Sequence, residues 1–151
     1  KLLQEVNFIW DARESRWQKR YQELKKYLLT NGDTDVPQTY PENPSLGIWI
    51  NNQRRTRIKG MLSAEKIDLL DEIGFIWDRA EWVWQKMYNE LINYAKKEGR
   101  TNVPLTYAEN PSLGRWVSTQ RQAFKKGKLA AEKIESLQKI KFDWNPGKKL
   151  H

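Results

Sequence analysis

Residues 36–49 read VPQTYPENPSLGIW, and residues 103–116 read VPLTYAENPSLGRW. The offset of 67 residues between these segments is constant along the chain. When residues 11–77 are laid over residues 78–144 without a gap, 35 of the 67 positions are identical. Self-similarity at a fixed period of this length is typical of a chain built from repeated helical or strand units, so the sequence predicts a tandem repeat.

The repeat predicts the domain organisation. We expect a C-terminal tail of a preceding repeat at 1–10, repeat A at 11–77, repeat B at 78–144 and a C-terminal tail at 145–151. The first of these follows from LLQEVNFIW at 2–10, which matches LLDEIGFIW at 69–77. The chain also lacks an initiator Met, and we therefore interpret it as a fragment of a longer protein.

Each repeat is expected to fold as a three-helix bundle, which makes the fold class all-α. A capping box, Asp followed three residues later by Glu, begins the first helix at Asp11 and at Asp78. Gly32 and Gly99 end that helix. Apolar residues at helical spacing form its buried stripe: Trp17, Tyr21, Leu24 and Leu28 in repeat A, and Trp84, Tyr88, Leu91 and Ala95 in repeat B.

The second helix is predicted to be amphipathic. Asn43-Pro44 and Asn110-Pro111 begin it, with Pro in the first helical position, and a glycine ends it. On a helical wheel its apolar side holds Leu46, Trp49, Ile50 and Gln53, and in repeat B Leu113, Trp116, Val117, Gln120 and Phe124. The other side is cationic. Ser63 or Ala130 then begins the third helix, which exposes one face and buries Ile67, Leu70 and Ile73 or their counterparts.

Composition narrows the possible classes of protein. The chain has no cysteine, so it has neither disulfides nor thiolate chemistry. No apolar run approaches the roughly 18 residues of a transmembrane helix. We expect a soluble, cytoplasmic chain without a membrane partner.

The positive charge is concentrated in one window of each repeat. The net charge is +8, and no acidic residue lies between Glu42 and Glu65 or between Glu109 and Glu132. The remaining 18 basic residues are balanced by 19 acidic residues. The basic residues of the two windows are Arg54, Arg55, Arg57 and Lys59 in repeat A, and Arg115, Arg121, Lys125, Lys126 and Lys128 in repeat B.

An acid-free cationic face is unfavourable unless an anion relieves the repulsion between its charges. These nine residues are therefore candidates for binding nucleic-acid phosphates. Arg54 and Arg121 are the strongest, because they align and offer forked donors. Gln53 and Gln120 are expected to bind loop backbone near the core.

Gly47 and Gly114 fit two interpretations, close approach to a phosphate or close packing of the helix. The aromatic residues that recur in both repeats are expected to form the core. Trp82 aligns with Ser15 and has no counterpart, so it is a candidate for base stacking, with packing between repeats as the alternative.

Catalytic signals are absent from the sequence. There is no phosphate-binding G-x-x-x-x-G-K-[ST] loop. The stretch LLDEIGF at 69–75 resembles an ATPase strand ending in Asp-Glu, but Gln138 and Lys139 replace Asp71 and Glu72 in repeat B. Helical spacing of the neighbouring apolar residues places this pair on an exposed helix face. His151 alone offers no metal site, so we expect neither catalytic residues, cofactor nor metal.

The motifs LGIWINNQRRTRIKGML and LGRWVSTQRQAFKKGKL, with a first helix of Trp and Tyr and a terminal Phe-x-Trp, resemble the helicase-associated domain family. The resemblance covers residues 2–144. It implies three-helix units that accompany the ATPase core of bacterial superfamily 2 helicases and bind nucleic acid. Lys141 departs from the pattern by replacing a Gly, and Ala130 by replacing a capping Ser. Both changes are expected to lower local stability.

The sequence thus leads to two hypotheses. In the first, the chain is an accessory module of a helicase and binds nucleic acid, DNA in preference to RNA, along the basic faces. In the alternative, it is a protein-interaction repeat or a rigid spacer that positions the motor domain or a partner. In both, the chain itself is not an enzyme and a helicase core in the same parent chain is a partner.

Overall fold

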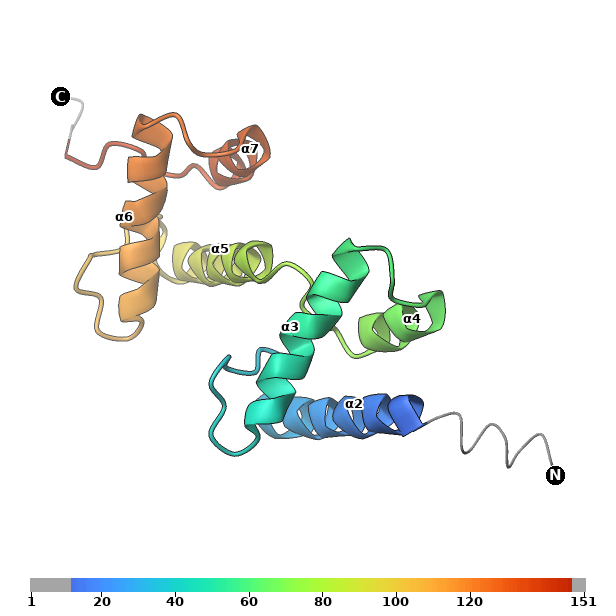
Figure 1. Ribbon diagram of the computed structural model, residues 1–151. Helices are drawn as coiled ribbons and strands as arrows, with labels where there is room; N and C mark the ends of the chain where they lie inside the picture. Colours follow the sequence, from blue (N-terminus) through green and yellow to red (C-terminus); the bar gives the residue numbers. More distant parts are fainter. Residues whose placement is uncertain (1–11, 148–151) are drawn as a thin grey trace. The chain divides into compact units, whose positions relative to one another are not determined.

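A computed structural model describes residues 12–147, which form six α-helices and no strand (Figure 1). The helices are α2 (Ala12–Asn31), α3 (Pro44–Ile58), α4 (Ala64–Glu72), α5 (Arg79–Glu98), α6 (Pro111–Lys125) and α7 (Ala131–Lys139). They belong to two compact units, Lys1–Arg79 and Ala80–His151. The predicted all-α fold of tandem helical repeats is confirmed.

Glycines end the first and second helices of each repeat, as predicted. Helix α2 stops one residue before Gly32, whose φ is +87°, and α5 stops one residue before Gly99, whose φ is +72°. A positive φ excludes most side chains and therefore stops helix growth. Helix α5 begins directly after Asp78, at the predicted position, whereas Asp11 lies outside the described residues.

An Asn-Pro pair begins the second helix of each repeat and also ties it to the first. Asn43 and Asn110 are the N-cap residues, and the Asn110 side chain accepts a hydrogen bond from the backbone N–H of Leu113 at 3.2 Å. The side-chain amide of Asn43 donates to Glu23 Oε1 at 2.8 Å, and that of Asn110 donates to Glu90 Oε1 at 2.9 Å. In repeat B one residue thus both caps the second helix and ties it to the first, whereas in repeat A the Asn43 side chain makes the tie without a capping hydrogen bond.

Repeat B differs from repeat A at the start of its third helix and at the turn that follows that helix. The Ser63 side chain caps α4 by accepting a hydrogen bond from the backbone N–H of Lys66 at 3.3 Å, whereas Ala130 gives α7 no side-chain cap. Lys141 has a φ of +59°, close to the +72° of Gly74 at the equivalent turn. A side chain in this conformation is strained, because its Cβ approaches the backbone carbonyl.

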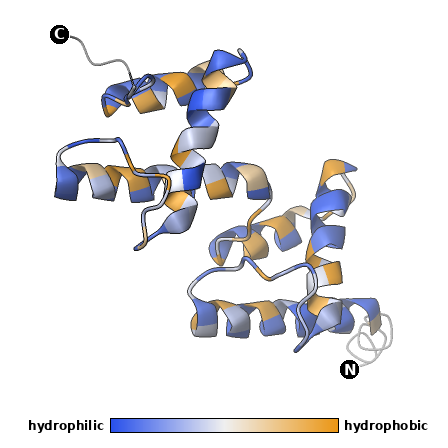
Figure 2. Ribbon diagram, turned by 90° about the vertical axis from the view of Figure 1, so that its left-hand side faces the viewer, coloured by the Kyte–Doolittle hydropathy of each residue, from blue (hydrophilic) through white to orange (hydrophobic). Residues whose placement is uncertain are grey.

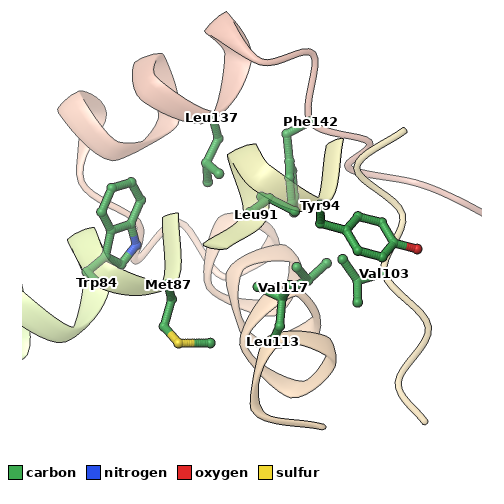
Figure 3. Close-up of a cluster of buried hydrophobic side chains, with 9 residues drawn as sticks. All are labelled: Trp84, Met87, Leu91, Tyr94, Val103, Leu113, Val117, Leu137 and Phe142. Atoms are coloured by element: carbon green, nitrogen blue, oxygen red, sulfur yellow. The ribbon is translucent and has the colours of Figure 1, made fainter. Parts of the chain in front are cut away.

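Each repeat has its own apolar core. Figure 3 shows the core of repeat B, where side chains of all three helices and of the loop before α6 point toward one another. Leu91, Val117 and Leu137, one from each helix, are fully buried there. The core of repeat A contains Trp17, Tyr21, Leu24, Val36, Leu46, Ile50, Leu70 and Phe75. Figure 2 shows hydrophobic and hydrophilic residues interspersed along the helices.

A buried hydrogen bond joins the first two helices of each repeat. Trp17 Nε1 donates to Gln53 Oε1 at 2.8 Å, and Trp84 Nε1 donates to Gln120 Oε1 at 2.9 Å. The expectation that these glutamines bind loop backbone is therefore wrong for their side-chain oxygens. A buried indole N–H needs an acceptor, and the glutamine side chain supplies it inside the core.

The recurring tryptophans belong to the scaffold, as predicted. Trp17 and Trp84 are buried, and four further tryptophans pack partly buried against the two cores: Trp49, Trp77, Trp116 and Trp144. Trp10 lies outside the described residues.

Candidate nucleic-acid interface

Seven of the nine candidate cations are exposed on the second helix or the turn that follows it. These are Arg55, Arg57 and Lys59 in repeat A, and Arg115, Lys125, Lys126 and Lys128 in repeat B. The ion pairs found within residues 12–147 all join other residues. The exposed cations are therefore not neutralised by a carboxylate in the part of the chain that the structure describes.

Arg54 and Arg121, the strongest candidates from the sequence, have a structural role. Arg54 Nε donates to the carbonyl oxygen of Ile76 at 2.7 Å, and Arg121 Nε donates to that of Asp143 at 2.8 Å. Burial lowers the pKa of both guanidinium groups below the ordinary value. A nearby carboxylate, Asp35 for Arg54 and Asp143 for Arg121, offsets part of that effect. Both side chains are only partly accessible.

Further contacts fix each of these arginines in place. An Arg54 terminal N–H donates to Asn51 Oδ1 at 3.1 Å, and an Arg121 terminal N–H donates to Asn102 Oδ1 at 3.2 Å. Each guanidinium also lies over a phenylalanine ring, 5.7 Å from the Phe75 centroid in repeat A. The arginines thus hold the second helix against the segment that closes the repeat. Their alignment between repeats is explained by folding.

Arg57 and its counterpart Phe124 cover the last tryptophan of their repeats. The Arg57 guanidinium carbon lies 4.4 Å from the ring centroid of Trp77. The Phe124 ring stacks on Trp144 with 4.2 Å between centroids and 28° between planes. Phe124 remains 39% exposed, so it lies at the edge of the apolar side rather than in the core. A cation and an aromatic ring perform the same packing task at one position.

The exposed faces of the two second helices differ in apolar content. Repeat A exposes Ile48, Ile58 and Met61, with 61%, 85% and 76% of their surfaces accessible. The aligned residues of repeat B are Arg115, Lys125 and Lys128. At these three positions the second-helix segment is therefore basic in repeat B and apolar in repeat A.

Close packing accounts for the two helical glycines. A Cβ added at Gly47 would lie 2.8 Å from the carbonyl oxygen of Gln38 and 2.9 Å from that of Pro37. At Gly114 it would collide with the carbonyl oxygen of Pro104. The second helix thus rests on the backbone of the loop that precedes it, and only glycine leaves room for that contact.

A polar hollow of about 480 Å³ lies beside the Gly47 contact. Its lining includes Asp35, Asn51, Arg54 and Arg79. Arg79 holds the Asp35 carboxylate with two hydrogen bonds, of 2.8 and 3.1 Å. The charged groups of this hollow therefore already have partners within the unit Lys1–Arg79.

A second hollow of about 480 Å³ is lined by basic and aromatic side chains at the start of α2: Arg13, Arg16, Trp17, Lys19, Arg20 and Trp49. The two charge windows do not predict it, because the basic residues of α2 lie outside the windows, where acidic residues are equally frequent. The available signal was the helical spacing of Arg13, Arg16 and Arg20, which places them on one side of the first helix.

The remaining candidates have the following environments. Trp82 is half-buried, and Lys86 Nζ lies 5.3 Å from its ring centroid, so its proposed stacking on a base stays a prediction. Asp71 and Glu72 are exposed on α4, as predicted, and Asp71 Oδ1 accepts a hydrogen bond from Trp77 Nε1 at 2.7 Å.

Among the described residues, no cluster of His, Cys, Asp or Glu is suited to a metal ion. None of the helices in this part of the chain has the length and apolar character of a membrane span.

Comparison with protein families identifies a domain that matches both repeats. Neither the curated proteins nor the solved structures contain a significant match to the chain. The family model of the helicase associated domain matches residues 14–78 and residues 81–145. The two matches follow each other along the chain and cover most of it. The chain therefore belongs to the helicase-associated domain family and carries two tandem copies of the domain.

Proposed function

We propose that the chain is an accessory module of a helicase and binds the phosphate backbone of DNA or RNA through the basic face of the second helix in each repeat. The observation that carries this proposal is the set of seven exposed cations that take part in no ion pair among residues 12–147. A polyanion would relieve the repulsion between them. The family supports an association with helicases, and the ATPase core would lie elsewhere in the parent chain.

The proposed binding is electrostatic and should depend strongly on salt. Binding that neutralises about four to six phosphates gives a slope of log K against log salt of roughly −4 to −5 on duplex DNA. Repeat B should contribute most to the affinity. It has Lys125 and Lys128 at the positions where repeat A has the exposed apolar residues Ile58 and Met61. Arg54 and Arg121 support the face indirectly, by holding the helix in place.

The test is charge reversal in repeat B. The variant Lys125→Glu/Lys126→Glu should lose most of the affinity for a labelled duplex in fluorescence anisotropy. The matched control is Lys96→Glu/Arg100→Glu, which changes two exposed cations of the same repeat outside the second helix. Equal losses in both variants would show that only net charge matters and would refute the assigned face. Absence of binding by the unaltered chain at low salt would refute the function.

The exposed apolar residues of α3 favour a second candidate function, a protein-interaction or spacer repeat that positions the motor domain. Ile58 and Met61 are 85% and 76% exposed beside the basic face. Replacing them with the residues of repeat B, as Ile58→Lys/Met61→Lys, should abolish binding of the chain to the ATPase core if this function holds. If α3 instead contacts nucleic acid, the two added charges should raise affinity for duplex DNA.

A further inference from the structure

The hollow at the start of α2 joins two features that suit a nucleotide, aromatic rings and clustered cations. Trp17 and Trp49 line it together with Arg13, Arg16, Lys19 and Arg20, and it encloses about 480 Å³. We propose that it binds one nucleotide of a single strand, with the base stacked on Trp49 and the phosphate held by Arg13 and Arg16. The site is separate from the basic faces of the second helices. It rests on the proposed function in one respect, that the ligand is a nucleic acid.

Two of the cations of this hollow, Arg13 and Arg16, are not compensated by an ion pair among residues 12–147. Glu14, the acidic residue of the first turn, forms an ion pair with Lys66 at 3.3 Å, and Glu23 forms one with Arg20 at 2.8 Å. No ion pair among residues 12–147 includes Arg13 or Arg16, and both are exposed. Like charges three residues apart on a helix repel each other, so a bound phosphate would be favourable.

Repeat B shows that the fold does not need these cations. Its Trp84–Trp116 pair has the same geometry as Trp17–Trp49, with 5.6 Å between centroids and 62° between planes in both. The positions of Arg13, Arg16, Lys19 and Arg20 are occupied in repeat B by Ala80, Val83, Lys86 and Met87. Three of the four charges are therefore specific to repeat A. Arg20 pairs with Glu23, whereas Arg13 and Arg16 have no ion-pair partner among residues 12–147, so a role in ligand binding accounts for these two arginines better than a role in packing.

The aromatic lining selects an unpaired base. Trp17 is 7% exposed and already stacks on Tyr21 with 5.3 Å between centroids, whereas Trp49 is only half-buried. Trp49 is thus the ring with surface left for a ligand. A base inside a duplex is stacked on its neighbours, so only a single-stranded base can stack on an indole.

The experiment uses the whole chain and a fluorescein-labelled oligothymidylate with one 5-iodouracil, which forms photocrosslinks to an aromatic ring in contact with it. The unaltered chain should crosslink at Trp49, located by mass spectrometry of the peptides. The variant Arg13→Ala/Arg16→Val carries the residues of repeat B and should lose that crosslink. Each phosphate that is no longer neutralised changes the slope of log K against log salt by about 0.7. At 0.1 M salt, relative to 1 M, the affinity should therefore fall by about 5-fold for one lost contact and about 25-fold for two.

The matched control is Lys25→Ala/Lys26→Ala, which removes two exposed charges from the same helix outside the hollow. It should keep the Trp49 crosslink and most of the affinity. Equal loss in both variants, or crosslinks only outside the hollow, would refute the proposed site. Duplex binding by Lys125→Glu/Lys126→Glu tests the proposed function separately, so the nucleotide site can stand if the second-helix face fails.

Discussion

Replacing Gly47 or Gly114 with Ala changes the second helix in two opposing ways. In an exposed helix interior, Ala is more favourable than Gly by about 1 kcal/mol. At these positions, however, the new methyl group would meet backbone. The Cβ at position 47 would lie 2.8 Å from the carbonyl oxygen of Gln38, whereas ordinary contact begins at 3.4 Å. The loop would have to retreat by about 0.6 Å, the difference between these distances.

Overpacking of this kind costs about 1 to 3 kcal/mol. After the gain in helix propensity, we expect Gly47→Ala to lower the free energy of unfolding by about 1 kcal/mol. Gly114→Ala should lower it by about 2 kcal/mol, because its Cβ would approach the carbonyl oxygen of Pro104 more closely. The sign is thus opposite to that expected from helix propensity alone.

Urea unfolding followed by far-ultraviolet circular dichroism measures these changes. Asn52→Ala is the control, because Asn52 is exposed within α3 and its replacement should raise stability by about 0.5 kcal/mol. Nucleic-acid affinity is measured on the same variants by anisotropy. If both glycine variants keep or gain stability and lose affinity instead, the glycines serve approach to a phosphate and the packing explanation fails.

Three further predictions concern repeat B. Lys141→Gly should stabilise it by about 1 kcal/mol in urea unfolding, because glycine adopts a φ of +59° without strain; an equal gain from Lys141→Ala would contradict this reason. Ala130→Ser should add about 1 kcal/mol in the same assay by capping α7, and an unchanged midpoint would count against a cap like that of α4. The hydrogen bond from Tyr107 lowers the pKa of Glu109 and raises that of Tyr107 to about 12. Because the pKa of Glu109 is lowered in the folded state, the stability from this bond is present above the ordinary glutamate pKa. That stability is lost as the pH falls through the lowered pKa of Glu109. Tyr107→Phe should therefore raise the pKa of Glu109 measured by carbon-13 NMR titration.

Local signals in the sequence predict the helices well. Gly32 and Gly99 end the first helix because their positive φ is a property of the residue and its immediate neighbours. Asn43-Pro44 and Asn110-Pro111 begin the second helix for an equally local reason. Such features need no knowledge of the tertiary structure.

Contacts distant in the sequence are harder to predict. Alignment with Arg121 makes Arg54 the strongest phosphate candidate in the sequence, yet its Nε binds a carbonyl 22 residues away. Gln53 binds an indole 36 residues away rather than the loop. The hollow over Trp49 likewise forms only when α2 and α3 dock. Identity between repeats therefore indicates first what the fold requires.

The exchange of Arg57 for Phe124 shows how copies of one domain can diverge. A guanidinium plane and a phenyl ring are both flat and both pack on an indole, so one replacement alters the charge of a repeat while its last tryptophan stays covered. Duplication followed by such replacements can change the net charge from one copy of the domain to the next while the scaffold stays the same.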